Sequence, residues 1–426
     1  MLKDHPNVRL SSEEVARRVV NAVENEGKEA VMIEEEFTTE LVDPGEVSMD
    51  EGRLQRLKKA VEEDTEKGTY DGAVFAVARH GKVVMHEAVG KTDLEKGRQA
   101  ALDDVFFVMS LTKKLTAVRV LMDVERGKFD LDTPVCEVIP EFGCKGKQNV
   151  TVRHVLTHTS GLNTELPYGV PVDQLGNIET VVSFMSNERV LARPGTVVSY
   201  NPICAHSIVA TMVTRLDEAG RPFRQIMRED LFEPLGMADT AVGLPDRLRD
   251  RVVPVVVRDR TPGLFEPLLL EALNFLANEE TELPAGGGLS TAMDIMRFAE
   301  MMRRGGELNG ARILSEEMVR EATSNQTGDM INRLWDYARE MYGWPDFPAY
   351  LGLTFFLRGE GEFPTPLGLK ASPGSFAGLG AGSTMFWVEP ERDLTYVFLS
   401  AGLMEEGPSV ERHQRLSDMV IDAVVD

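Results

Sequence analysis

The sequence predicts an α+β fold in which an antiparallel sheet is flanked by helices. Strand patterns lie near both ends of the chain, at about 70–90 and again at about 383–402. Most segments between about 137 and 284 are helical or loop-like and are interrupted by Pro and Gly. We therefore expect the carboxyl-terminal third to pack beside the early strands and complete the sheet, with the helical region as an insertion.

The first part of the chain is rich in Glu and Lys. Apolar residues recur there at helical spacing in two stretches, 15–23 and 54–61, which the Asp43-Pro44-Gly45 turn separates. This pattern predicts a helical amino-terminal extension over residues 1–68.

The pattern changes at Tyr70 to the short-range alternation of a strand. The runs AVFAVAR and VVMHEAVG flank His80-Gly81-Lys82, which predicts two strands joined by a tight turn. From Phe106 to Gly127 apolar residues return to helical spacing, and Gly127 is suited to end the helix. Ser110 is expected near the start of that helix.

The remaining elements follow the triple glycine at 286–288. A helical stretch is predicted at 293–304, then an aromatic-rich loop at 335–356, two strands in STMFWV and LTYVFLSAG, and a closing amphipathic helix. We predict a sheet domain over 69–145 and 286–426, a mostly helical domain over 146–285, and the Ser110 helix at their interface. The loop aromatics either wall a substrate pocket or anchor the loop, and these are Trp335, Tyr337, Tyr342, Trp344, Phe347 and Tyr350.

Composition limits the partners of the chain. Of its 426 residues 42% are hydrophobic and 27% charged, as expected of a globular protein with a large core. The formal charge of −23 makes nucleic acid and anionic membranes poor partners and favours small molecules. Three cysteines do not suggest a disulfide framework, and neither a signal peptide nor an apolar run of about 20 residues is evident. We expect a cytoplasmic location, while the oligomeric state is not predicted.

Ser110 and Lys113 are three residues apart, which on a helix places a hydroxyl and an amine on one face. A serine hydroxyl becomes a strong nucleophile when a neighbouring base takes its proton. A lysine can be that base if burial or nearby positive charge lowers its pKa. The apolar residues 106–109 would supply the dry surroundings. This pair alone is a weak pattern, because it arises by chance in many chains.

Three longer segments strengthen the case. They are FFVMSLTKKLTAVRVLMDVERGKFDLDTPVCEVIPEF, TVRHVLTHTSGL and ARPGTVVSYN. Together they resemble the serine β-lactamase-like family, which includes class C β-lactamases, D-alanyl-D-alanine carboxypeptidases, D-aminopeptidases, family VIII carboxylesterases and lovastatin-type acyltransferases. The resemblance extends from about Tyr70 to the end of the chain. It implies a β-lactamase/transpeptidase-like fold and an acyl-enzyme mechanism.

The resemblance assigns roles to individual residues. Ser110 matches the nucleophile, Lys113 the lysine that accepts or relays its proton, and Tyr200 the second proton-transfer group. A tyrosine base requires a nearby Lys113 to favour its phenolate, so the first proton acceptor stays open between the two. The backbone N–H groups of Ser110 and Ala381 would face the developing oxyanion, and Gly380 would permit close approach of the substrate.

The sequence departs from the family at two positions of substrate recognition. The family's Tyr-x-Asn motif has Pro202 in place of the asparagine, so Asn201 is the candidate to take over its contact. The third motif, Lys-Thr-Gly or His-Thr-Gly in many relatives, aligns with Gly378-Leu379-Gly380 and lacks a cation. Because that cation helps to bind a substrate carboxylate, Gly378 argues against a dedicated β-lactamase or carboxypeptidase.

Other sites find less support in the sequence. His154 and His158 are four residues apart, but no HExxH motif or third ligand accompanies them, and we expect neither metal nor cofactor. No Gly-x-Ser-x-Gly elbow is present. We predict a serine hydrolase of small carboxylic esters or, less favoured, amides. The alternatives are an acyltransferase, a β-lactamase or D-amino-acid peptidase, and a non-catalytic binding descendant.

Overall fold

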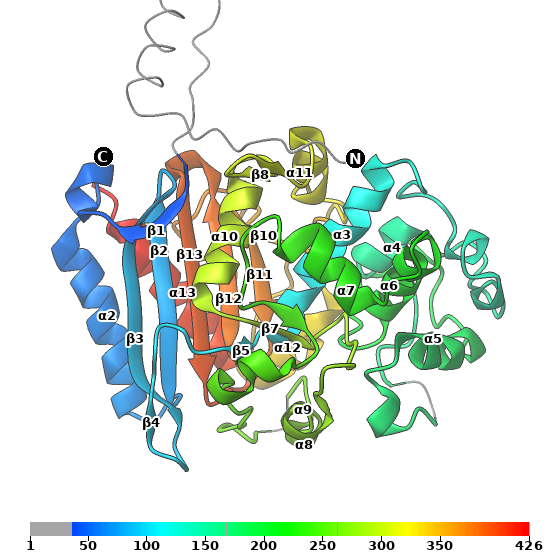
Figure 1. The fold of residues 1–426 in the computed structure, drawn as a ribbon, viewed down its shortest axis with the longest axis horizontal. Helices are drawn as coiled ribbons and strands as arrows, with labels where there is room; N and C mark the ends of the chain where they lie inside the picture. The colour runs from blue at the N-terminus through cyan, green and yellow to red at the C-terminus, as the bar shows by residue number, and fades with distance from the viewer. Residues whose placement is uncertain (1–35, 167–168, 262, 426) are drawn as a thin grey trace, which may run out of the picture. The chain divides into compact units, whose positions relative to one another are not determined.

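A mixed sheet of eight strands organises the described part of the chain, which in this computed structural model comprises residues 36–166, 169–261 and 263–425 (Figure 1). Its order is β1-β3-β2-β13-β12-β11-β10, with β4 paired to β3, and every pairing is antiparallel except β1 with β3. The strands are β1 (Thr38–Leu41), β2 (Gly72–Arg79), β3 (Lys82–Asp93), β4 (Arg98–Gln99), β10 (Phe356–Leu357), β11 (Phe376–Gly380), β12 (Thr384–Glu389) and β13 (Leu394–Ala401).

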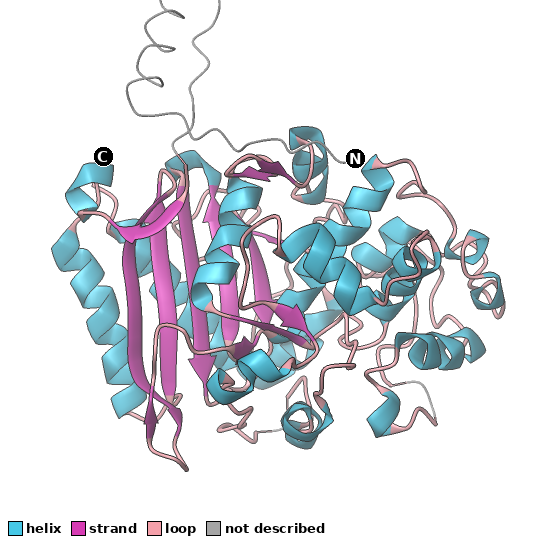
Figure 2. Cartoon of the chain, in the orientation of Figure 1, coloured by secondary structure: helices cyan, strands magenta, loops and turns pink. Residues whose placement is uncertain are grey.

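The central strand β2 is buried on both faces, which explains its continuous apolar sequence. Successive side chains of a strand alternate between faces. Val74 and Ala76 therefore join the core that includes α10 (Ala292–Arg303), whereas Phe75 and Val77 join the core that includes α2 (Glu51–Glu66) and α13 (Glu406–Asp422). Figure 2 shows these helices on opposite faces of the sheet. The pairing of β2 with β13 confirms that the carboxyl-terminal third completes the sheet beside the early hairpin.

Short helices and long loops form the region between the two parts of the sheet (Figure 1). Its helices are α4 (Val152–Leu156), α5 (Ile178–Asn187), α6 (Ala205–Arg215), α7 (Phe223–Met227), α8 (Pro267–Glu271) and α9 (Leu273–Leu276). A small sheet of order β5-β7-β6 lies beside it, formed by Phe106–Phe107, Gly288–Ser290 and Ala241–Val242. The remaining elements are α3 (Thr112–Glu125), α11 (Glu316–Ala322), α12 (Asp336–Tyr342) and the hairpin of β8 (Glu307–Leu308) and β9 (Ala311–Arg312).

The element predicted at Phe106–Gly127 begins later than expected. Phe106 and Phe107 form strand β5, because they pair with Ser290 and Leu289 of β7. A 3-10 turn over Met109–Leu111 then leads into α3. Ser110 thus lies just before the α-helix, at the point where a strand of the small sheet becomes a helix.

The predicted amino-terminal extension falls only partly within the described residues. Its first helical stretch, 15–23, lies outside them. The second forms α2, which packs against β3 and α13, and the residues from Phe37 onward form one compact unit. The boundaries proposed at residues 68, 145 and 285 stay predictions. In the described residues no helix has the length and apolar character that crossing a membrane requires.

Candidate active site

The nucleophile candidate lies on a turn that several hydrogen bonds hold in place. Met109, directly before Ser110, has a φ of 50°, a left-handed conformation that is uncommon for a residue with a side chain. The N–H of Val108 donates to the carbonyl of Gly288 at 2.9 Å, and the hydroxyl of Thr384 donates to the carbonyl of Val108 at 2.8 Å. The two sheets therefore both fix the backbone that presents Ser110.

Lys113 is fully buried one turn after Ser110, and its Nζ lies 3.1 Å from Ser110 Oγ. The amine also donates to the backbone carbonyls of Pro202 and Ala285, each at 2.7 Å. Burial, and secondarily the charge of Lys114, hold the pKa of Lys113 well below its usual value. The structure thus places an amine with a strongly lowered pKa against the hydroxyl, in the dry surroundings that the sequence predicted.

Tyr200 reaches the same point from the loop before α6. Its ring centroid lies 5.1 Å from Lys113 Nζ and 4.5 Å from the ring of His158. Burial raises the pKa of Tyr200 and Glu406 adds to this, while a hydrogen bond with Ser110 acts in the opposite direction. Because burial raises the pKa of this phenol, its environment does not favour the phenolate. The three predicted catalytic residues nevertheless meet in one place.

Asn201 and Pro202 differ from their expected roles. The side-chain oxygen of Asn201 accepts from the N–H groups of Cys204 and Ala205, and its amide donates to the carbonyl of Asn163. Its polar atoms thus support the start of α6, which argues against the predicted substrate contact. Pro202 contributes through its backbone, because its carbonyl accepts from Lys113. The carbonyl at position 202 therefore holds the lysine, although the asparagine side chain of the family motif is absent there.

The glycines of β11 serve packing. A Cβ on Gly378 would come within 2.5 Å of the Phe386 ring, so Gly378 faces the core and the structure does not support its predicted contact with substrate. A Cβ on Gly380 would come within 2.4 Å of the carbonyl of Val108. Gly380 therefore lets β11 approach the turn that carries Ser110. Ala381 lies one residue past the end of the β11–β12 ladder and lines the pockets at Ser110, where an oxyanion donor is expected.

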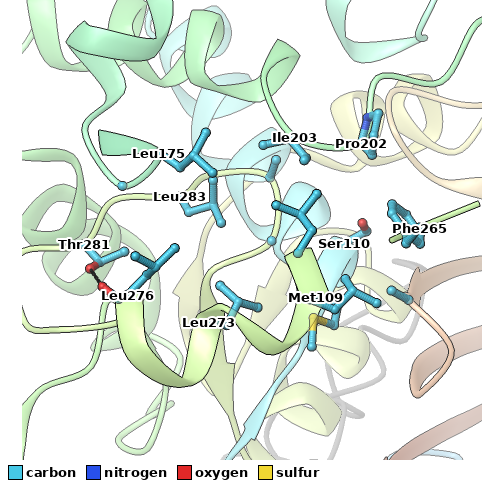
Figure 3. Close-up of a pocket in the computed structure, with 16 residues that line it drawn as sticks. Met109, Ser110, Leu175, Pro202, Ile203, Phe265, Leu273, Leu276, Thr281 and Leu283 are labelled. Carbon is cyan, nitrogen blue, oxygen red and sulfur yellow. Dashed lines mark hydrogen bonds between the residues drawn. The ribbon is translucent and has the colours of Figure 1, made fainter. Parts of the chain in front are cut away.

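A pocket with a cavity volume of about 70 Å³ opens beside Ser110 and is almost entirely apolar (Figure 3). Figure 3 shows Ser110 near Phe265 and Met109 at one side, with Leu276 and Thr281 at the other. The aliphatic lining comes largely from α8, α9 and the segments that flank them, and comprises Leu175, Ile203, Leu269, Leu270, Leu273, Leu276 and Leu283. The sequence did not predict this wall, because leucines in short helices do not indicate which surface they will contact.

A second, smaller pocket also reaches Ser110 and has a different lining. Its wall includes Trp335, Phe356 and the carboxyl group of Glu406, the first residue of α13. Of the two interpretations of the aromatic loop, the pocket wall holds for Trp335. Anchoring fits Phe347 and Tyr350, whose rings stack on Phe363. No motif had pointed to Glu406.

The two histidines considered as metal ligands have other contacts. The Nδ1 atom of His154 accepts from the N–H of Thr151 at 3.2 Å in a capping box, and His158 packs on Tyr200. In the part of the chain that the structure describes, no group of three or more potential ligands is placed to hold a metal ion.

Comparisons with known proteins concern the family and the fold of the chain. The model of the family described as Beta-lactamase matches residues 57–418. The chain is 31% identical to Esterase EstB of Burkholderia gladioli over 63% of this chain and 74% of that one. It is 26% identical to Esterase/beta-lactamase LipL of Mycobacterium tuberculosis over 79% and 78%. The crystal structure of a penicillin-binding protein homolog from Caulobacter crescentus superposes with a TM-score of 0.72 at 24% identity, over 87% and 97% of the two chains, which supports the predicted fold.

Proposed function

The chain belongs to the beta-lactamase family, and from this premise we propose that it hydrolyses carboxylic esters through an acyl group carried on Ser110. Two of the similar proteins are named as esterases, EstB and LipL. The observation that carries the proposal is the contact of the buried Lys113 amine with Ser110 Oγ at 3.1 Å. A hydroxyl beside an amine of low pKa has little reason to exist in a purely structural core.

Lys113 is the first proton acceptor in this proposal. A neutral amine has two N–H groups and one lone pair. The carbonyls of Pro202 and Ala285 take up the two N–H groups, which leaves the lone pair for the hydroxyl of Ser110. Tyr200, whose phenol stays protonated because its pKa is raised, supplies a proton to the departing alcohol.

The reaction then has two halves. Ser110 Oγ attacks the ester carbonyl carbon while its proton passes to Lys113, and the N–H groups of Ser110 and Ala381 stabilise the oxyanion. The bond to the alcohol breaks, the alcohol takes up a proton, and an acyl-enzyme ester remains on Ser110. Water attacks that ester with the same groups acting in reverse, which releases the carboxylic acid and regenerates the hydroxyl.

The leucine-lined pocket is proposed to hold the acyl group. Its lining is nearly free of polar atoms, and Ser110 lies at its edge. An aliphatic acyl chain would bury its methylene groups there, each contributing about 0.8 kcal/mol to binding. No charged side chain among the described residues lines this pocket, so acyl groups without a carboxylate are favoured.

Ser110→Ala is the test of this function. Hydrolysis of p-nitrophenyl butyrate is expected to fall by about 10³-fold or more, since removing the nucleophile leaves only binding and the oxyanion donors. A fluorophosphonate probe should add one adduct to the wild-type protein, measured by intact mass, and none to the variant. Hydrolysis of equal rate in both proteins, or an adduct on another residue, would contradict the proposal.

A further inference from the structure

The smaller pocket beside Ser110 combines an acidic side chain with aromatic walls. Glu406 is 5% exposed and lines this pocket together with Ser110, Trp335 and Phe356. Tyr200 also contributes to the lining, so the carboxyl group shares a cavity with two of the groups that perform the chemistry. The mechanism proposed above uses neither Glu406 nor Trp335.

The carboxyl group of Glu406 is only partly satisfied by the protein. Its Oε1 accepts from the N–H of Gly382 at 2.9 Å, and no described residue donates to its Oε2. Among the described residues, Arg412 is the one positively charged residue that lowers the pKa of Glu406. Its guanidinium donates hydrogen bonds to the hydroxyl groups of Ser400 and Ser409. A buried carboxylate without a counter-charge is unfavourable, and a cation in the pocket would remove that cost.

Capping of α13 does not explain this residue. The side chain of Glu405 already accepts from the N–H of Gly407 at the start of the helix, and it also accepts from the hydroxyl of Tyr342. Burial, and secondarily Glu405, raise the pKa of Glu406 to about 8, and a bound cation would hold the group ionised. Glu406 thus has one carboxyl oxygen without a donor among the described residues, and it lines the pocket beside Ser110.

The aromatic part of the wall suits the same kind of ligand. A cation is attracted to the faces of tryptophan and phenylalanine rings, and an alkylammonium group also gains from contact with apolar surface. The net charge of −23 favours the approach of cations over that of anions.

We propose that the pocket lined by Glu406 and Trp335 binds an alkylammonium group on the alcohol portion of the substrate, an inference that rests on the proposed esterase function. The acyl chain then occupies the leucine-lined pocket, the scissile carbonyl lies at Ser110, and the cation meets Glu406. The protein is accordingly an esterase with a preference for cationic esters, where a relative with a cation in the third motif would select a carboxylate.

A matched pair of substrates tests this preference. Butyrylthiocholine and the 3,3-dimethylbutyl thioester of butyric acid share an acyl group and a shape but differ by one positive charge. The wild-type protein is expected to prefer the cationic thioester by about tenfold or more in kcat/KM, measured by thiol release. In Glu406→Gln, which keeps an acceptor oxygen for Gly382, the ratio of the two kcat/KM values should approach one.

The control is Glu411→Gln, which removes one negative charge from an exposed position of the same helix. Glu411→Gln should retain the wild-type preference for the cationic thioester. If Glu406→Gln and Glu411→Gln lose this preference equally, net charge causes the effect and the proposal is overturned. Equal ratios in wild type and Glu406→Gln would also overturn it. If Glu406→Gln hydrolyses the neutral thioester poorly as well, the residue only holds Gly382, and the proposal fails.

Binding gives a readout that does not depend on catalysis. Tetramethylammonium chloride should change the tryptophan fluorescence of the wild-type protein saturably, against potassium chloride at equal ionic strength, since Trp335 lines the pocket. Glu406→Gln and Trp335→Leu should each weaken this binding by about fivefold or more. If the protein hydrolyses neutral esters normally but does not bind tetramethylammonium, the cation site alone is refuted. If it binds tetramethylammonium but shows no hydrolysis that depends on Ser110, the esterase function alone is refuted.

Discussion

At the catalytic centre, Lys113 Nζ contacts three oxygen atoms that come from three separate segments, and each of these distances is 3.1 Å or less. In the two pockets beside it, most contacts are between apolar side chains, and one carboxyl oxygen of Glu406 has no described donor. Several hydrogen bonds fix the position of each catalytic group, whereas one apolar side chain of a pocket wall can be replaced by another of similar size. Chemistry and substrate preference are therefore expected to respond very differently to substitution.

The largest effect is expected at the centre, from Lys113→Met. Removing the proton acceptor should lower kcat/KM for p-nitrophenyl butyrate by about 10³-fold. Lys114→Met is the matched control, because Lys114 is equally buried but has no hydrogen-bond partner among the described residues. The kcat/KM of Lys114→Met should fall by less than about tenfold. Similar losses in the two variants, measured by initial rates, would show that Lys113 acts through burial of an amine rather than through its contact with Ser110.

The pH dependence of the reaction sharpens the assignment of the base. Burial lowers the pKa of Lys113, and the neutral amine is the active form. Activity is thus present above that pKa and lost as the pH falls through it, by about tenfold per pH unit in kcat/KM. Tyr200, whose pKa is raised, should cause no alkaline loss near neutrality. If the loss of activity at low pH occurs at a different pH in Glu406→Gln, the carboxyl group of Glu406 and not Lys113 controls that loss.

The smallest effect is expected in the leucine-lined pocket. Leu273→Ala removes part of the wall and should lower kcat/KM for p-nitrophenyl hexanoate by about tenfold while leaving the acetate ester within about twofold. Leu268→Ala provides the control, since Leu268 lies on α8 but is 76% exposed. If Leu273→Ala lowers kcat/KM equally for both esters, Leu273 positions the catalytic centre. The contrast between the centre and the pocket walls would then not apply to Leu273.

Motifs identified the catalytic centre because its chemistry requires particular residue types at short spacing. Ser110 and Lys113 are one turn apart, and the resemblance to the serine β-lactamase-like family implied that Tyr200 joins them. Phe106 and Phe107 were misassigned to a helix because their pairing partners, Leu289 and Ser290, are about 180 residues away in the chain. The spacing of apolar residues over a short segment does not predict a contact between residues so far apart in the chain.

The amino-acid sequence by itself determined the fold class, the packing of the carboxyl-terminal third beside the early hairpin, and the shared helical face of Ser110 and Lys113. The resemblance to the serine β-lactamase-like family added Tyr200 to these two residues. The sequence could do so because alternation, helical spacing and catalytic motifs are local properties of a chain. Only the tertiary structure decided that Gly378 faces Phe386, that Asn201 supports α6, and that Glu406 lines a pocket at Ser110. The surroundings of a side chain depend on which distant segments pack around it, and no short pattern specifies them.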